Sequence, residues 1–271
     1  MPDTKQEEKL IRVVRSYYRR HGRHNLPWRK TDNPYRILVS EVMLQQTQVS
    51  RVIPKYHAFV KQFPTVRALA HATLRDVLVA WQGLGYNRRA KMLHETAKRV
   101  AREYAGRMPR TYDELVTLPG VGPYTAGAIC VFAYNQPVPL IETNIRTVLF
   151  HHLLQGWHSV SDHELMELVT RLQGRKEPRS WYWALMDYGS HLKEEGVRLN
   201  HKSKHHVKQS RFKGSDREAR GAILKVLAQH RTRTQQCIVR DTSIARGRVA
   251  TQLMRLKKEG MVVKKGTSWS L

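Results

Sequence analysis

The feature that most constrains this fold is a helical spacing of apolar residues that continues through most of the chain. From Val49 to Phe63 the apolar residues recur every three or four positions, and we expect Thr47 to cap that helix. The same spacing predicts further helices at 74–81, 89–104, 112–118, 124–134, 144–154, 163–172 and 181–192. Because strand signals are scarce before residue 260, the sequence predicts a mainly α-helical domain over residues 1–192.

A smaller domain is expected after a basic linker. Residues 193–214 are basic and almost without large apolar side chains, so we interpret them as a loop or linker. The helical spacing then returns in three segments, with Thr234 as the expected cap of the second, and two strand-like runs follow around Lys265 and Gly266. Three helices followed by a basic hairpin are typical of a winged helix-turn-helix, which we expect over residues 215–271.

The charge of the chain indicates a polyanionic partner. Lys and Arg number 48 against 22 Asp and Glu, which gives a formal net charge of +26. A field of this sign suits nucleic acid or an anionic membrane surface. The sequence shows no apolar membrane span and no signal peptide, so we favour nucleic acid and expect a cytoplasmic, nucleoid-associated protein.

The cysteines do not predict a metal site. Cys130 and Cys237 lie far apart in the sequence, each in an apolar helical context. Two such thiols cannot hold a metal cluster between them, so we expect buried thiols in a reducing compartment and no bound metal.

The sharpest local motif is LPGVGPYTAGAI, residues Leu118 to Ile129. Gly120 and Gly122 allow a tight turn between two helices, and the N–H groups at the start of the second helix can bind a phosphate oxygen. An ordinary helix–helix turn is the alternative. Together with the overall charge, the motif favours a helix-hairpin-helix that binds DNA phosphate without reading sequence.

Five motifs together resemble one family. LPWR, SEVMLQQTQV, WQGLGYNRRA, LPGVGPYTAGAI and PLIETNIRTVL occur in the order and at about the spacing seen in helix-hairpin-helix (HhH-GPD) DNA glycosylases. The resemblance covers about residues 8–192 and looks closest to MutY-type enzymes, which remove adenine opposite 8-oxoguanine or guanine. It implies a two-lobed helical fold, an enzyme of base excision repair and a partner duplex that contains a mismatch or an oxidised base. We also expect the protein to be a monomer.

Two carboxylates suit the chemistry that the resemblance implies. Breaking a base–sugar bond leaves negative charge on the base and positive charge on the sugar, so an acid near the base and an anion near the sugar both help. Glu41 matches the family's general acid, and its apolar neighbours would favour the protonated form; a surface ion pair is the alternative. Glu142 stands where the family has an aspartate. We expect it to stabilise the cationic sugar or position water, held by Asn144, the alternative being a plain residue at a helix N-terminus.

Tyr124 occupies the position where bifunctional relatives carry a Schiff-base lysine. A tyrosine cannot form that adduct, and Arg146 stays protonated, so we expect a monofunctional enzyme. In MutY-type enzymes a tyrosine at this position lies in the adenine pocket, which the resemblance implies for Tyr124. Packing in the core is the alternative.

The resemblance also implies a set of DNA-contacting residues. Gln46 and Tyr86 match the wedge that fills the space left by a flipped nucleotide, and Gln45 and Gln48 would pair with the orphaned base. Backbone contacts are expected from basic residues of the helical domain and of the wing, with a solvated surface as the alternative for those after Tyr86. These residues are Arg88, Arg89, Lys91, Arg146, Arg246, Arg248, Lys264 and Lys265. For the winged helix, recruitment of a partner and a purely structural role at the C-terminus are the alternatives.

The sequence departs from the family in two places. Most relatives carry four cysteines that ligate an iron–sulfur cluster, and counting that spacing places the four positions at Lys193, Asn200, Ser203 and Gln209, none of which is a thiolate ligand. We therefore expect no cofactor. MutY proteins also usually add a hydrolase-like C-terminal domain that senses the oxidised base, for which residues 215–271 are too short.

Two other functions fit the same motifs. Relatives that remove thymine or uracil from mismatches with guanine share the hairpin and often the tyrosine, but they typically lack the glutamate at the Glu41 position. A DNA-binding protein without catalysis, in which the winged helix reads sequence, is the second alternative.

Overall fold

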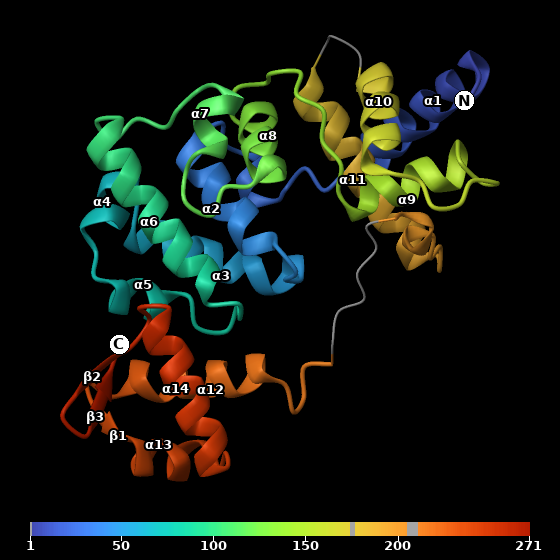
Figure 1. The fold of residues 1–271 in the computed structure, drawn as a ribbon. Coiled ribbons are helices and arrows are strands. Elements are labelled where there is room, and N and C mark those ends of the chain that lie inside the picture. Colours follow the sequence, from blue (N-terminus) through green and yellow to red (C-terminus); the bar gives the residue numbers. More distant parts are fainter. Residues whose placement is uncertain (1, 174–176, 205–210) are drawn as a thin grey trace. The chain divides into compact units, whose positions relative to one another are not determined.

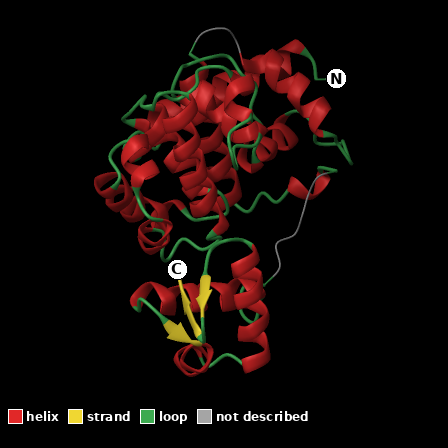
Figure 2. Ribbon diagram, turned by 60° about the vertical axis from the view of Figure 1, so that its left-hand side comes forward, coloured by secondary structure: helices red, strands yellow, loops and turns green. Residues whose placement is uncertain are grey.

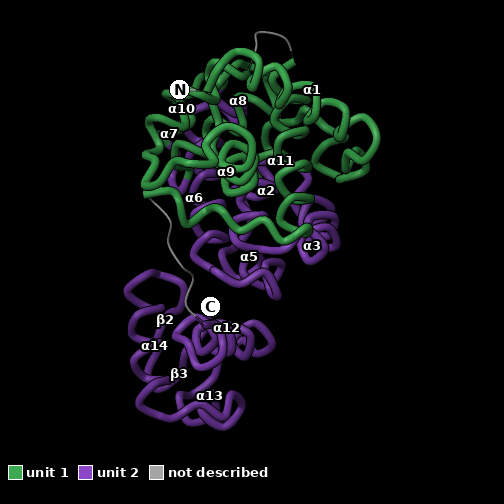
Figure 3. The backbone as a smooth tube through the Cα atoms, turned by 90° about the vertical axis from the view of Figure 1, so that its right-hand side faces the viewer, with its two compact units in different colours: residues 1–38, 110–117, 121–208 green, residues 39–109, 118–120, 209–271 purple. Residues whose placement is uncertain are grey.

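The computed structural model describes residues 2–173, 177–204 and 211–271, and these residues are mainly helical (Figure 1). The chain divides into two compact units whose segments alternate along the sequence (Figure 3). Unit 1 comprises residues 1–38, 110–117 and 121–208, and unit 2 comprises residues 39–109, 118–120 and 209–271. Across the described residues, no helix is both long and apolar enough to cross a membrane.

Unit 1 is built around the packing of three helices. α11 (Pro178–Glu194) packs against α9 (Thr143–His152) and against α1 (Thr4–His21). The remaining elements of this unit are η1 (Pro27–Arg29), the start of α2 (Pro34–Leu44), α7 (Tyr112–Val116), α8 (Pro123–Phe132), α10 (Asp162–Gln173) and η2 (Asn200–Lys202). A capping box fixes the beginning of α1, because the side chains of Asp3 and Gln6 each accept from the other's backbone N–H.

A buried ionic cluster ties the N-terminal segment of unit 1 to α11. Asp187 is only 2% exposed, and its carboxylate accepts from the backbone and side chain of Arg23 and from two nitrogens of Arg29, at 2.6 to 2.8 Å. Burial alone would raise the pKa of Asp187, but the hydrogen bonds and charges of Arg29 and Arg23 hold it below its usual value. The carboxylate therefore stays ionised and satisfied inside the unit.

The first part of unit 2 is a helical lobe. It contains the end of α2, α3 (Val49–Gln62), α4 (Val66–His71), α5 (Leu74–Ala80) and α6 (Arg88–Glu103), with α4 and α5 both packed on α6. Thr65 and Thr73 cap α4 and α5 through their side chains. The prediction that Thr47 caps α3 is wrong: the N-cap is Gln48, without a side-chain hydrogen bond, because the Thr47 hydroxyl bonds to the carbonyls of Gln45 and Leu84.

The C-terminal part of unit 2 has the three helices and the hairpin that the sequence predicts. The helices are α12 (Asp216–Gln229), α13 (Gln235–Thr242) and α14 (Arg246–Lys258). Thr234 caps α13 as expected, accepting from the N–H of Cys237 at 3.3 Å. β2 (Val263–Lys265) and β3 (Ser268–Ser270) are antiparallel, and β1 (Arg233–Thr234), which the sequence did not reveal, pairs with β3 in the order β1-β3-β2 (Figure 2).

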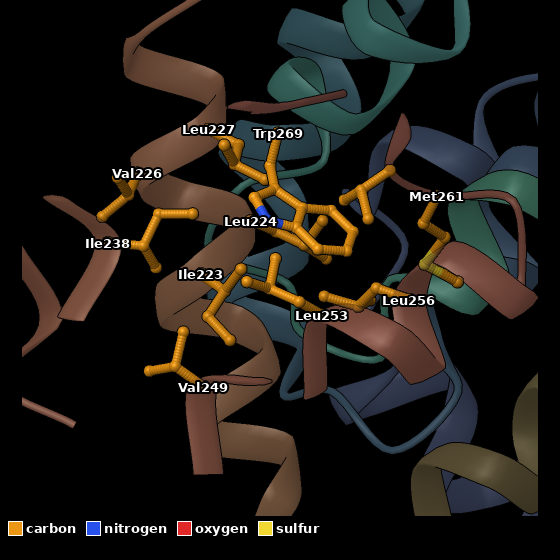
Figure 4. Packing of buried hydrophobic residues seen from close by; sticks show 11 residues of the cluster. Ile223, Leu224, Val226, Leu227, Ile238, Val249, Leu253, Leu256, Met261 and Trp269 are labelled. Carbon is orange, nitrogen blue, oxygen red and sulfur yellow. The ribbon is translucent and has the colours of Figure 1, made fainter. Parts of the chain in front are cut away.

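This small region has an apolar core of its own. Trp269 on β3, only 3% exposed, packs among aliphatic residues from all three helices (Figure 4). The burial of one aromatic ring and ten aliphatic or sulfur-containing side chains is the main contribution to the folding of a segment of this size. Cys237 is only partly buried, whereas Cys130 is buried on α8, so the expectation of a buried thiol holds for Cys130 alone.

The expected helices beyond Thr47 begin and end within three residues of those in the structure. α1, α2 and α4 were not singled out by the spacing of apolar residues. α4 is short, and α2 is apolar on most of its surface, so neither presents the alternation of buried and exposed faces on which such a prediction depends.

Candidate active site and DNA interface

The helix-hairpin-helix turn is fixed by a close approach to α6. Gly120 has φ +72, and a Cβ atom there would lie 2.5 Å from the Cβ of Met92. The Thr96 hydroxyl donates to the carbonyl of Pro119 at 2.5 Å, one residue before this glycine. Both the left-handed backbone and the lack of space require glycine at position 120.

The start of α8 suits an anion. Gly122 is its N-cap and makes no side-chain hydrogen bond, and Pro123 occupies the first turn. Gly122 is exposed, and a Cβ atom on it would meet open space. The backbone N–H groups of this helix start therefore receive no cap from Gly122, the arrangement that binds phosphate at helix N-termini. Tyr124 lies half-buried in the same first turn.

Glu41 is a buried acid in the middle of α2. It is 8% exposed, and its neighbours Leu38, Val42 and Met43 are 1%, 5% and 0% exposed. The surface ion pair considered from the sequence requires an exposed position, which Glu41 does not have. Most of this side chain is therefore removed from water.

Two short loops of unit 2 carry the expected wedge residues in a strained conformation. Gln46, after α2, has φ 54, and Tyr86, before α6, has φ 47. The left-handed region costs a non-glycine residue about 1–2 kcal/mol. Gln46 and Gln48 are exposed, and Gln45 and Tyr86 are half-buried. Such strain persists only where the surrounding structure imposes it, and it concentrates at functional sites.

The Arg89 side chain holds both strained loops. One terminal nitrogen, Nη1, donates to the carbonyls of Val42, Met43 and Gln45 at 2.6 to 3.0 Å. The other, Nη2, donates to the Thr47 hydroxyl and to the carbonyls that precede Tyr86, at 3.1 to 3.2 Å. The guanidinium also lies 5.4 Å from the ring centres of Trp81 and Tyr86. We name these contacts the Arg89 clamp.

The Arg89 clamp corrects the sequence interpretation of this residue. Arg89 was expected to contact the DNA backbone or to lie on a solvated face, but its guanidinium is turned inward. Burial lowers the pKa of Arg89 to about 10, so the side chain remains protonated at neutral pH. Arg88, its neighbour, is exposed and stays a predicted DNA contact.

In unit 1, Glu142 is the N-cap of α9. One oxygen of its carboxylate, Oε1, accepts from the backbone N–H groups of Asn144 at 2.8 Å and Ile145 at 2.9 Å. The other, Oε2, lies 3.3 Å from the Thr143 hydroxyl, which donates to it. The extra methylene relative to an aspartate is taken up by folding the side chain back onto the helix. The positive end of the α9 dipole lies beside this carboxylate.

Asn144 contacts Glu142 through its backbone and uses its side chain elsewhere. The side-chain oxygen Oδ1 accepts from the ammonium of Lys193 at 2.8 Å, and Lys193 also donates to the Thr143 hydroxyl at 3.0 Å. The sequence interpretation assigned the restraint of Glu142 to Asn144 alone. Lys193 was missed, because the sequence from residue 193 onward was interpreted as a linker, whereas α11 extends to Glu194 and carries this lysine.

The sequence comparison decides the family. The pattern of the HhH-GPD superfamily base excision DNA repair proteins matches residues 39–177, which is half of the chain and includes Glu41, the hairpin and Glu142. The chain belongs to the HhH-GPD superfamily. Adenine DNA glycosylase of Mycolicibacterium smegmatis is 52% identical over 130 residues, which cover 48% of this chain and 44% of that protein. The protein of the same name from Rattus norvegicus is 38% identical over 191 residues, or 66% of this chain and 37% of that protein.

Solved structures place the chain in the same fold. A thermostable thymine-DNA glycosylase matches with a TM-score of 0.61 and 25% identity over 69% of this chain and 87% of that chain. A trapped endonuclease III–DNA covalent intermediate also matches with a TM-score of 0.61, at 18% identity over 70% of this chain and 88% of that chain. The chain spans about half the length, or less, of the adenine DNA glycosylases that it matches.

As an HhH-GPD chain, the protein distributes its expected site residues between both units. Unit 2 brings Gln45, Gln46 and Tyr86 together around the Arg89 clamp and also contains Glu41. Unit 1 contains Tyr124 and places Glu142 and Asn144 at one helix start. That the two carboxylates face one pocket stays a prediction.

Arg146 has partners inside unit 1. Its side chain is 15% exposed and pairs with Asp162, and the same nitrogen, Nη1, donates to the Ser203 hydroxyl at 3.0 Å. The guanidinium thus makes an ion pair and a hydrogen bond inside unit 1 that the sequence did not suggest. A phosphate contact of Arg146 stays a prediction. Within the described part of the chain, no three His, Cys, Asp or Glu side chains are grouped to hold a metal ion.

The C-terminal region displays basic side chains on its last helix and its hairpin. Arg246 begins α14 and is exposed, as are Lys264 and Lys265 on β2. Lys264 lies with its ammonium 5.6 Å from the ring centre of Trp269. Arg248, by contrast, donates to the carbonyl of Gly214 at 2.8 Å and so holds the start of this region.

One basic residue of the C-terminal region contacts the expected wedge. Arg217, in the first turn of α12, donates to the hydroxyl of Tyr86, and its guanidinium lies 5.2 Å from the centre of that ring. Arg75 fixes the other end of α12 by donating to the carbonyls of Leu227 and Ala228 at 3.1 and 2.9 Å. No sequence signal distinguishes Arg217 from the other basic residues around it.

Proposed function

We propose that the protein is a monofunctional DNA N-glycosylase that removes adenine mispaired with 8-oxoguanine or guanine by hydrolysing the N-glycosidic bond. The observation that carries the proposal is Glu41, an acid only 8% exposed on a helix that leads directly into the strained loop of Gln46. The similarity to proteins named adenine DNA glycosylase, at 52% identity over 130 residues, supports adenine as the base.

Glu41 would act as the general acid. An adenine that leaves the sugar takes the bonding electron pair, so a proton delivered to a ring nitrogen lowers the barrier to departure. Glu41 is only 8% exposed, and the proposal assigns to it the protonated carboxyl that this step needs. Water then adds its hydroxide to the sugar, and its proton restores the acid.

Glu142 would stabilise the positive charge that develops on the sugar. It is a carboxylate whose position is set by two backbone N–H groups, so little reorganisation is needed when the cation forms. Tyr124 offers a phenol where a Schiff base would need an amine, so the product is an abasic site in an intact strand.

DNA binding would use both units. The start of α8 suits a phosphate, and the loops of Gln46 and Tyr86 suit insertion at a flipped base, with Gln45 and Gln48 facing the partner base. Arg88, Arg246, Lys264 and Lys265 are exposed cations that add phosphate contacts. We propose that the protein binds such a duplex as a monomer and without a metal.

A single-turnover assay tests the function. Duplexes with adenine opposite 8-oxoguanine, adenine opposite guanine, thymine opposite guanine and uracil opposite guanine are incubated with excess protein, and strand cleavage is measured after alkali. We expect release from the adenine duplexes, and no strand cleavage before alkali. Glu41→Gln should abolish release, while Glu8→Gln, an exposed acid on α1, should not.

Glu142→Asp tests the second carboxylate. Shortening this side chain restores the residue found in the family, so activity should be kept or increased. A collapse of activity would show that the site is built around the longer, folded-back side chain.

Normal release of adenine by the Glu41→Gln variant would refute the assignment of Glu41 as the general acid.

A second candidate is removal of thymine or uracil opposite guanine. The structural likeness to a thermostable thymine-DNA glycosylase, at 25% identity, favours it over other bases. The same duplex panel distinguishes the two activities. Tight binding of one duplex sequence with no base released would instead identify a DNA-binding protein without catalysis.

A further inference from the structure

The segment that follows α11 in unit 1 packs along α9. Its backbone is tied to the loop before α10, because Val160 donates to the carbonyl of Lys202 and accepts from the N–H of Lys204, both at 3.0 Å. η2 lies within this segment and packs against α9. The segment was expected to be a linker, but up to Lys204 it has a defined place in the fold.

Three side chains, one from the last turn of α11 and two from the segment after it, reach the first two turns of α9. Lys193 contacts Thr143 and Asn144, as described above. The amide oxygen of Asn200 accepts from the hydroxyl of Thr147 at 3.2 Å, and Thr147 is fully buried. The hydroxyl of Ser203, a residue only 6% exposed, accepts from Arg146 at 3.0 Å. We name Lys193, Asn200 and Ser203 the α9 strap.

The contacts of the α9 strap begin directly after Glu142, the N-cap of α9. The orientation of that carboxylate depends on the N–H groups of Asn144 and Ile145, which move with the helix start. α11 also approaches this point closely, since a Cβ atom on Gly189 would lie 2.3 Å from the carbonyl oxygen of Asn144. The start of α9 is therefore fixed by backbone packing on one side and by the Lys193 ammonium through a side chain.

Lys193 also acts through its charge. Burial lowers the pKa of this lysine, and the negative charge of Glu142 opposes the lowering. The ammonium of Lys193 thus interacts electrostatically with Glu142. Glu142 is the carboxylate that stabilises the cationic sugar in the proposed function. A partly desolvated cation interacts with a nearby carboxylate more strongly than a cation in water does.

The same three residues stand at positions where the family resemblance places iron–sulfur ligands. An ammonium, an amide and a hydroxyl do not fit a cluster, which needs cysteine thiolates. Cys130 and Cys237 are the only cysteines of the chain, and they belong to different units. The fourth position, Gln209, lies outside the described residues.

We propose that the α9 strap fixes the start of α9 with hydrogen bonds, at positions where the family resemblance places cluster ligands, and that Lys193 is the positioning residue for Glu142. The catalytic part of this inference rests on the proposed glycosylase function, whereas the structural part does not. Each part therefore has its own measurement.

Hydrogen exchange tests the structural part in the full-length protein without DNA. Lys193→Met removes the ammonium and keeps much of the side-chain length, and Lys204→Met removes one charge from an exposed position in the segment after α11. We expect exchange of the Asn144 and Ile145 amides to accelerate about 10- to 100-fold in Lys193→Met, the effect of losing hydrogen bonds from a charged donor. Lys204→Met should leave them unchanged. Equal exchange in both variants would overturn the proposal.

Single-turnover kinetics test the catalytic part. On a duplex with adenine opposite 8-oxoguanine, Lys193→Met should lower the rate constant at saturating protein about 10- to 100-fold, with an affinity for uncleaved duplex no weaker than that of Lys204→Met. Lys193→Arg, which keeps the charge and the donors, should recover part of the rate. A loss confined to DNA affinity would show that Lys193 only binds phosphate.

The outcomes separate the two hypotheses. If the wild-type protein releases no base from any duplex while Lys193→Met still accelerates exchange at Asn144 and Ile145, the proposed function fails and the strap stands. If the wild-type protein is active and Lys193→Met matches Lys204→Met in rate and exchange, the strap fails and the function stands. Added iron and sulfide should change neither result.

Discussion

Replacing Arg89 by methionine should destabilise unit 2 far more than the same change at Arg88. Arg89 donates to six oxygens around two loops, whereas Arg88 is exposed at the start of the same helix. Methionine keeps most of the side-chain length and the apolar packing, but it has no donor. The comparison therefore isolates the Arg89 clamp from the general effect of losing one positive charge.

The expected loss in the free energy of unfolding follows from the hydrogen bonds that Arg89 makes. A hydrogen bond from a charged donor contributes about 1.5–3 kcal/mol, and such contributions overlap when one group makes several. The strained residues Gln46 and Tyr86 add a cost of about 1–2 kcal/mol each that the clamp offsets. We expect Arg89→Met to lower the free energy of unfolding by about 3–5 kcal/mol, the range for breaking a buried charged network. Arg88→Met should stay within about 0.5 kcal/mol of wild type.

Urea unfolding followed by tryptophan fluorescence measures this difference. Trp81 lies against the Arg89 guanidinium and is fully buried, and it is one of the six tryptophans whose emission changes on unfolding. A loss of this size lowers the urea midpoint by about 1–2 M. Arg89→Lys, which keeps the charge and three donors, should fall between the two variants. Equal midpoints for Arg88→Met and Arg89→Met would show that the clamp contributes nothing and that the loops are held by other contacts.

Three further predictions concern other contacts. A double-mutant cycle of Tyr86→Phe and Arg217→Ala, measured by DNA affinity, should give a coupling free energy of about 1 kcal/mol, and a value near zero would remove the C-terminal region from the wedge. Burial lowers the pKa of His152 to about 4, so the unfolded chain binds the proton more tightly and stability should fall as pH drops from about 6.5 to 4. Because that ring is only partly buried, beside the Tyr188 hydroxyl, we expect a loss of about 1–2 kcal/mol, absent in a His152→Gln variant. Asp187→Asn should cost about 3–5 kcal/mol in thermal unfolding, since it leaves two guanidinium groups without their carboxylate, whereas a small change would mean that the arginines find other acceptors.

The sequence predicted the elements of this fold better than the contacts that hold the site. Apolar spacing located most helices, and Thr234 was recognised as a cap because capping is local and depends on residue type. Thr47 is the same residue type in a similar place, but a side chain from residue 89 engages its hydroxyl. Long-range partners of this kind leave no local signal.

The two carboxylates show the same limit. Burial of Glu41 followed from its apolar neighbours, and a position of Glu142 at a helix N-terminus was one of the alternatives considered. The partner of Asn144 did not follow, because Lys193 looks like any other lysine of a basic segment. The packing between α9 and α11 decides which lysine turns inward, and this packing is visible only in the three-dimensional structure.

The ionic cluster at Asp187 sets an order of events during synthesis of the chain. Its arginine partners are 158 and 164 residues closer to the N-terminus, and the whole helical lobe of unit 2 is translated between them. At about 5–20 residues per second, the early segment waits roughly 10–30 s on the ribosome for its carboxylate. During that interval two guanidinium groups and the apolar face of α1 are exposed to the cell. Nascent-chain chaperones could therefore bind this segment before it packs against α11.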